Sequence, residues 1–387
     1  MTKRVYLLIA ATVLMCCLLI AAVVVPTHSD ASLTSDLVIR EPDGGPKEMI
    51  WIPGGRFVMG VNSVPDPDNN PQKIKPDEYP AHDVELDGFW MDETPVTNRQ
   101  FREFIAMTGY KTLAERQLTK EDFRARGTDV SGFQQDVINP GSMCFNPAFD
   151  KTQLVIGPQG WEHQVWQVVD DANWAQPDGP GSTIKDRLDH PVVHMAWEDA
   201  VAYCEWAGKR LPTEAEFEYA ARNGGKDVVF PWGNELLPDG QYMANFWQGE
   251  FPTSRSNEDG WLTTSPVKSF PPSPLGLYDI AGNVWEWCGD YYHADYYAHS
   301  PRRNPRGPSE SYDPLDPLSN IKRVQRGGSF MCNVNSCTGY RTRARMRGDV
   351  ASSSFHNGFR GVVDSRMQAE FAAAQAKIAA WRKTQAN

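Results

Sequence analysis

The sequence predicts an α+β fold that is rich in loops and poor in regular secondary structure. Most of the chain consists of short strand-like runs separated by Gly, Pro, Asn and Asp, most clearly over residues 227–330. Stretches with helix start and stop signals are few. Hydrophobic residues make up 41% of the chain and charged residues 22%, which is normal for a globular protein with a substantial core. We therefore expect a few short helices and strands around that core, joined by irregular segments.

The first element is a candidate membrane segment. Lys3 and Arg4 precede residues 5–25, which carry no charge and would form a helix about 30 Å long, enough to span a bilayer core. Cleavable signals have shorter apolar regions and a small-residue cleavage site, so the sequence favours an uncleaved signal anchor over residues 1–26; a cleaved signal is the alternative. In both cases the body would be exported and extracytoplasmic, and an uncleaved segment would anchor it in the membrane. Residues 27–46 predict a polar linker.

The predicted body, residues 47–364, begins with two strands around a turn at Gly54 and Gly55. Two helices follow from capping boxes, in which a Thr and a Glu or Gln three residues later satisfy each other's backbone amides. Their sequences are NRQFREFIAMTG, residues 98–109 after Thr97, and EAEFEYAAR, residues 214–222 after Thr213.

Two more helices are expected from apolar periodicity. Residues 197–210 place Cys204 on an apolar face and reach a stop signal at Gly208, so Cys204 is expected to be a buried thiol rather than a ligand. The tail, residues 365–387, is Ala-rich, with apolar residues at helical spacing. It predicts a C-terminal helix that docks on the body or on a partner.

The charge balance argues against nucleic acid as a main partner. The chain has 49 acidic and 38 basic residues and a net charge of −11, whereas phosphate binding requires clustered Lys and Arg. The one basic cluster alternates with smaller residues over residues 341–347, which predicts one face of a strand. That face would be solvated or salt-bridged, or it would orient an anionic or peptide ligand.

The pair Cys332 and Cys337, in GGSFMCNVNSC, is the most informative chemical feature. A Cys-x4-Cys pair can form a small-loop disulfide, and a second pair or the histidines of a structural zinc site are missing here. Two thiolates without further ligands would suit a soft, low-coordinate ion such as Cu(I). The nearby Arg341 and Arg343 could favour the thiolate forms. The spacing alone leaves copper and a disulfide both open.

Two polar loops could bind Ca²⁺, which prefers hard oxygen donors around a tight turn. In LYDIAGNVWEWCGD, residues 277–290, the donors would be two carboxylates and two carbonyls, from Asp279, Gly282, Val284 and Glu286. In residues 244–261, Asn245 and Asp259 offer oxygen donors with carbonyls between them. The alternative is that both are ordinary loops in which Asn and Asp stabilise turns.

Several motifs together resemble the formylglycine-generating enzymes, the sulfatase-modifying factors. They occur in the family's order and span about residues 49–364: RLPTEAEFEYAAR, FPWGN, ANFWQGEFP, GLYDIAGNVWEW, RGGSFMCNVNSC and NGFRGV. GNVWEW and RGGSF mark only the wider superfamily, while the Cys332 and Cys337 pair matches the catalytic thiols of the true oxidases. The resemblance implies a loop-rich α+β fold related to the C-type lectin fold, with structural Ca²⁺.

The resemblance also implies a reaction and the residues that carry it. The family uses O₂ and Cu(I) to convert a cysteine in the Cys-x-Pro/Ala-x-Arg motif of an unfolded or extended sulfatase polypeptide to Cα-formylglycine. Cys332 and Cys337 would hold Cu(I), with Ser329 and Trp285 lining the active site. Calcium would be bound at two sets of positions: Asn245, Phe246, Asp259 and Trp261, and Asp279, Gly282, Val284 and Glu286.

The chain departs from the family pattern in ways that affect these expectations. The disulfides of animal members are absent, because the position that would pair with Cys204 is Gly361 and the second pair reads Ala221 and Thr342. His356 stands where the family often has Asn near the substrate groove. Two alternatives remain: a superfamily relative that oxidises another substrate, and a non-catalytic, calcium-binding, lectin-like module with a plain disulfide.

Overall fold

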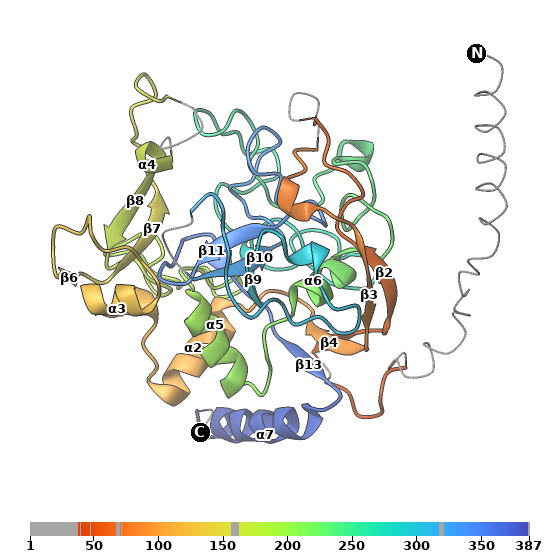
Figure 1. Ribbon diagram of the computed structural model, residues 1–387. Helices are drawn as coiled ribbons and strands as arrows, with labels where there is room; N and C mark the ends of the chain where they lie inside the picture. The colour runs from red at the N-terminus through yellow and green to blue at the C-terminus, as the bar shows by residue number, and fades with distance from the viewer. Residues whose placement is uncertain are drawn as a thin grey trace, which may run out of the picture. The chain divides into compact units, whose positions relative to one another are not determined.

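Short strands joined by long loops make up most of the fold (Figure 1). The computed structural model describes residues 38–385 apart from 39, 47, 67–69, 71, 156–161 and 317–320, and these residues belong to one compact unit, 37–387. Between residues 227 and 330 the described part of the chain has only two strands and two short 3₁₀ helices, which confirms the predicted loop-rich α+β class.

The strands pair across large distances in the sequence. One sheet has the order β11-β10-β9-β12, in which only the β12–β9 pair is parallel, and another has the order β1-β4-β13. Three two-stranded sheets pair β2 with β3, β5 with β6, and β7 with β8. The strands are β1 (Met49–Ile52), β2 (Gly55–Met59), β3 (His82–Leu86), β4 (Phe89–Asp92), β5 (Leu118–Thr119), β6 (Val137–Ile138), β7 (Gly141–Phe145), β8 (Trp166–Asp170), β9 (Trp285–Tyr291), β10 (Lys322–Arg326), β11 (Met346–Asp349), β12 (Asn357–Gly358) and β13 (Val362–Asp364).

The helices form where their caps predict. Thr97 accepts a hydrogen bond from the Gln100 amide, and Gly109 ends the helix in the left-handed region at φ 68°. Thr213 and Glu216 make the second capping box. The helices are α2 (Asn98–Thr108), α3 (Lys120–Ala125), α4 (Glu162–Val165), α5 (Trp197–Trp206), α6 (Glu214–Ala221) and α7 (Gln368–Gln385), with 3₁₀ helices η3 (Pro76–Glu78), η4 (Leu113–Glu115), η5 (Pro238–Gly240) and η6 (Tyr296–Ala298).

The core is built around α6, in which every residue is buried. The main apolar cluster joins Phe217 and Ala220 of this helix to side chains of β1–β4, β9 and β10. A second cluster joins α2 and α5, with Phe101 0% exposed and Cys204 1% exposed. Cys204 is therefore a free, buried thiol, as the sequence predicts.

The C-terminal helix α7 docks on the body, along its lower edge in Figure 1. Ile378 is buried, Gln375 donates a hydrogen bond to the Ala207 carbonyl, and Arg382 pairs with Glu103 at 2.7 Å. The expected terminal helix and its docking on the body are thus confirmed.

Two expectations are corrected. The predicted strand over residues 341–347 does not form as a whole, because β11 begins only at Met346.

The predicted signal anchor lies outside the described residues, and in the part of the chain that the structure describes no helix is long and apolar enough to cross a membrane. The expectation of an exported, membrane-anchored protein is withdrawn on this finding.

Candidate functional site

The two thiols lie on the loop between β10 and β11, here called the thiol loop (residues 327–340). Cys332 and Cys337 are joined by a disulfide, with their Cα atoms 5.2 Å apart. Cys332 is fully buried, whereas Cys337 is only partly buried. Both pack in an aromatic cluster with Phe246, Trp285 and Tyr340. The structure therefore brings the predicted thiols together in an apolar setting that is open on the Cys337 side.

A tight turn fixes the first half of the thiol loop. Gly328 has φ 73°, and a Cβ at this position would lie 2.5 Å from the Tyr340 amide nitrogen, so only glycine allows this approach. Ser329 is fully buried; its Oγ accepts a hydrogen bond from the Met331 amide, and its own amide lies 3.5 Å from the Cys332 Sγ. Ser329 thus lies directly beside the first thiol.

A second chain segment runs alongside the thiols. The Trp247 amide donates to the Cys332 carbonyl at 2.9 Å, and the Asn333 side chain donates to the carbonyls of Trp247 and Gly249. These bonds hold the thiol loop against residues 245–249, which belong to the first predicted calcium loop.

Trp285 forms the wall of the site on the β9 side. It is the first residue of β9 and is almost completely buried. A Cβ on Gly339 would lie 2.4 Å from its ring, and its amide donates to the His356 carbonyl. Ser329 and Trp285 therefore both lie next to the cysteines, where the sequence places them.

His356 is held as a neutral, partly accessible imidazole at the edge of this wall. Its ring packs against Phe355 and Trp166, and its Nδ1 is buried without a hydrogen-bond partner among the described residues. Burial, with a smaller effect from His194, lowers the pKa of His356 to about 3.

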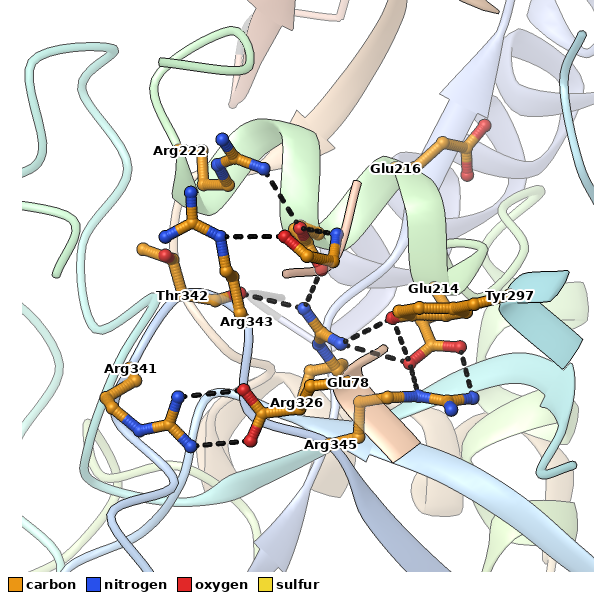
Figure 2. Close-up of polar contacts among 12 residues, drawn as sticks. Glu78, Glu214, Glu216, Arg222, Tyr297, Arg326, Arg341, Thr342, Arg343 and Arg345 are labelled. Carbon is orange, nitrogen blue, oxygen red and sulfur yellow. Dashed lines mark hydrogen bonds and ion pairs between the residues drawn. The ribbon is translucent and has the colours of Figure 1, made fainter. Parts of the chain in front are cut away.

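The arginines that follow the thiols bind carboxylates. Figure 2 shows Arg341 against Glu78 and Arg345 against Glu214, and all four side chains are almost fully buried. Arg343 pairs with Asp227 and Arg347 with Asp313. The salt-bridged alternative for this cluster is therefore correct. The proposed action of Arg341 and Arg343 on the thiols finds no support, because both guanidinium groups are bound to carboxylates.

Arg326, at the end of β10, links the thiol loop to the core helix α6. It donates to Glu214 at 3.0 Å, to Glu218 at 2.7 Å and to the Thr342 carbonyl at 2.7 Å, and it is fully buried (Figure 2). Such buried pairs contribute little net stability, but removing one partner leaves an uncompensated charge. They fix the position of the chain on either side of the cysteines.

The first predicted calcium set has one oxygen that lacks a partner. Asn245 donates from Nδ2 to the Thr263 carbonyl, while its Oδ1 is buried without a hydrogen bond among the described residues. The Asp259 carboxylate accepts from the Phe246 and Trp261 amides, and burial raises its pKa. A buried acceptor without a donor beside a carboxylate suits a hard cation.

The second predicted set adjoins the first but is more fully satisfied. Gly282 approaches Asn245 so closely that a Cβ would lie 2.6 Å from the Asn245 carbonyl oxygen. Glu286 is fully buried and accepts two hydrogen bonds from Arg360, at 2.7 and 2.8 Å. Asp279 accepts from the Lys268 amide, and Val284 is fully buried. A cation here would use lone pairs that Arg360 leaves free.

Sequence reasoning missed the residues around a cavity of about 530 Å³ next to the thiol loop. Its lining includes Phe330 and Met331, which directly precede Cys332, together with Trp247 and Arg255. Arg255 lies within the first predicted calcium loop, between Phe246 and Asp259. Nothing local showed that Arg255 would reach the thiol loop.

The side chains around the thiols offer few ligands for a metal ion. Among the described residues no group of three or more His, Cys, Asp or Glu side chains could hold an ion. The two cysteine sulfurs are adjacent, and two soft thiolates suit a low-coordinate soft ion once the disulfide is reduced.

Known proteins resemble this chain over most of its length. The family model described as "Sulfatase-modifying factor enzyme 1-like domain" matches residues 34–365. A protein of Thermomonospora curvata named formylglycine-generating enzyme is 43% identical over 86% of this chain and 99% of its own length. The bovine protein of the same name is 41% identical over 82% of this chain and 75% of its own.

Two further comparisons qualify the match. A mouse protein named inactive C-alpha-formylglycine-generating enzyme 2 is 37% identical over 81% of this chain and 84% of its own length. The solved structure of PvdO from Pseudomonas aeruginosa is 23% identical, covers 81% of this chain and 93% of that one, and has a TM-score of 0.50. The structure comparison shows the fold, and overall identity does not separate active from inactive relatives.

Proposed function

This chain belongs to the sulfatase-modifying factor family, and from that premise we propose that it oxidises a cysteine in a Cys-x-Pro/Ala-x-Arg motif of a sulfatase polypeptide to Cα-formylglycine. The observation that carries the proposal is the juxtaposition of Cys332 and Cys337 in an aromatic site that is open on one side. In the overall reaction, the thiol, O₂, two electrons and two protons give the aldehyde, hydrogen sulfide and water. The electrons come from an external reductant.

In the reduced protein, Cys332 and Cys337 would hold Cu(I) as thiolates. When bound, Cu(I) supplies one-electron chemistry with O₂ and an affinity for a further sulfur ligand. Cys337 is the more accessible of the two, so the substrate cysteine would arrive from its side. Trp285, Tyr340 and Phe246 form apolar walls around the buried Cys332, while Cys337 stays partly accessible. The buried Ser329 holds the turn that positions Cys332.

Calcium would stabilise the segments that pack against the thiol loop. In our proposal, Asn245 and Asp259 with the carbonyls of Phe246 and Trp261 hold one ion; Asp279 and Glu286 with the carbonyls of Gly282 and Val284 hold a second. Asn245 Oδ1, which accepts no hydrogen bond within the part of the chain that the structure describes, supports the first site. Because the thiol loop hydrogen-bonds to residues 247 and 249, an ion there would steady the loop.

A second candidate function rests on the disulfide itself. If Cys332 and Cys337 stay bonded, the chain is a non-catalytic, calcium-binding, lectin-like module. A mouse relative named as an inactive C-alpha-formylglycine-generating enzyme is 37% identical to this chain, so relatives named as inactive occur at comparable identity.

A single experiment separates the two candidates. The full chain is reduced, loaded with Cu(I) and incubated in air with a Cys-x-Pro-x-Arg peptide. Oxidase activity lowers the peptide mass by about 18 Da, the difference between a thiol and an aldehyde side chain. Cys332→Ser and Cys337→Ser abolish this change, while Cys204→Ser, a buried free thiol outside the site, serves as the matched control. No mass change, with a disulfide that resists mild reductant, would favour the binding module.

A further inference from the structure

Arg255 is a part-buried cation without a carboxylate partner next to the thiol loop. Its guanidinium lies 4.6 Å from the Trp247 ring centroid and 5.5 Å from that of Phe330. It donates to the Phe330 carbonyl at 3.2 Å and lies 4.0 Å from the Met331 sulfur. Its Nε is buried without a hydrogen-bond partner among the described residues. Among the described residues Arg255 forms no ion pair, and Asp259 is the one carboxylate that acts on it electrostatically.

No ion pair among the described residues compensates the charge of Arg255. The cavity that it lines contains one carboxylate among its lining residues, Asp178, which is already paired with Arg187 at 2.7 Å. The other cation in the lining, Lys151, is bound to the Thr253 carbonyl. Burial lowers the pKa of Arg255 to about 10, against the opposing pull of Asp259, so the guanidinium is still charged at neutral pH.

A charged group held in this way is suited to an anionic ligand. An unsatisfied donor is unfavourable in a buried setting, and the planar guanidinium matches a carboxylate in a bidentate arrangement. The faces of Trp247 and Phe330 fix the plane of the guanidinium, so little freedom is lost on binding. Arg255 donates to the carbonyl of Phe330, which lies two residues before Cys332 in the thiol loop, so a peptide bound at the thiols would pass close to this cavity.

We propose that Arg255 binds an Asp or Glu side chain of the substrate polypeptide close to the target cysteine, and so determines which sulfatase sequences this chain prefers. This inference rests on the proposed function, since it concerns the peptide that the thiol site would take. The Arg of the Cys-x-Pro/Ala-x-Arg motif cannot fill this cavity favourably, because two cations would face each other. The Asp or Glu that binds Arg255 is therefore expected at a substrate position other than that of the motif Arg.

The test compares pairs of peptides that contain Cys-x-Pro-x-Arg and carry Glu or Gln at one flanking position, scanned on both sides of the motif. At one position the wild-type full chain should convert the Glu peptide with a kcat/KM about tenfold above that of the Gln peptide, as for a charge-assisted hydrogen bond. In Arg255→Gln the ratio should fall to about one, and Arg255→Lys should restore part of it. Because the ratio is taken within each variant, a loss of folded protein does not change it.

Arg99→Gln is the matched control, because Arg99 is exposed and paired with Asp189 outside this cavity. It should keep the wild-type ratio. A Glu/Gln ratio within about twofold of one at every position, or a preference that persists in Arg255→Gln, would overturn the inference and leave the proposed function intact. If no peptide is converted, the proposed function fails. Fluorescence anisotropy of the same peptide pairs on the reduced protein then decides the role of Arg255 from the ratio of Kd values.

Discussion

At the residue scale, the cysteines of the described chain differ sharply in accessibility. Cys337 is partly exposed and Cys332 is fully buried, while Cys144, Cys204 and Cys288 are free thiols in the interior. Burial raises the pKa of Cys144 to about 11, and it raises the pKa of Cys204 and Cys288 further. Since the thiolate is the reactive form, the three interior thiols should be inert.

This difference predicts an order of alkylation. After mild reduction at pH 8, iodoacetamide should modify Cys337 first and Cys332 at least about tenfold more slowly, and it should leave the interior thiols intact, because at pH 8 a thiol of pKa about 11 is only about 0.1% thiolate. Peptide mapping by mass spectrometry measures the order, and unfolding in urea is the control in which these five of the seven cysteines all react. Early modification of Cys144, Cys204 or Cys288 would contradict the packing described here.

At the element scale, one carboxyl group makes the contact between β9 and α6 sensitive to pH. Asp290, near the end of β9, accepts a hydrogen bond from the amide of Glu214, the first residue of α6. Burial, helped by the charge of Glu214, raises the pKa of Asp290 to about 8. In the unfolded chain an Asp ionises near pH 3.9, so between these values the folded state binds the extra proton. The contribution of Asp290 to stability is therefore full below about pH 4 and is lost as the pH rises towards 8.

Asp290→Asn should remove this pH dependence, because the amide keeps an acceptor for the Glu214 amide and does not titrate. The difference in free energy of unfolding, variant minus wild type, should increase by roughly 1.4 kcal/mol per pH unit between about pH 4 and 8. Urea titrations at pH 5, 6, 7 and 8 measure the difference. Asp189→Asn removes a charge at an exposed position and controls for the change in net charge. A difference that does not vary with pH would show that Asp290 is ionised in the folded protein.

The elements also show what local sequence can predict. Thr97 with Gln100 and Thr213 with Glu216 define helix starts from four residues, and both helices form. The strands next to Gly54 and Gly55 also form, but they do not pair with each other: β1 pairs with β4 and β2 pairs with β3. Strand pairing depends on contacts far apart in the sequence, which no local pattern encodes.

The same limit applies to the site. Cys332, Cys337, Ser329 and Trp285 could be named because each sits in a recognisable motif, and the structure places them together. Arg255 and Glu78 could not be named, because their importance lies in contacts with the thiol loop and with Arg341 directly after it. Glu78 meets Arg341 across 263 residues, and Arg255 reaches Phe330 across 75.

At the scale of the whole molecule, calcium bound in the two predicted loops should raise the free energy of unfolding of the whole chain. An ion at 100 times its Kd that binds only the folded state would add about 2.7 kcal/mol. Adding EGTA should therefore lower the Tm of the full chain, and returning excess Ca²⁺ should restore it. Asp259→Asn should remove the part of this shift that comes from the first calcium site, whereas Asp189→Asn, at an exposed position, should keep the whole shift. A Tm that does not respond to EGTA would exclude calcium as a structural ion.

The pairing of Glu78 with Arg341 determines when, during synthesis, the thiol site can take its folded form. A carboxylate made early is matched by an arginine made late, and Trp285 is held through its amide by His356, near the end of the chain. An incomplete chain on the ribosome would therefore carry Cys332 without the supports that fix its position. We therefore expect the thiol site to form only once the nearly complete polypeptide has left the ribosome. A short excised fragment should not form it.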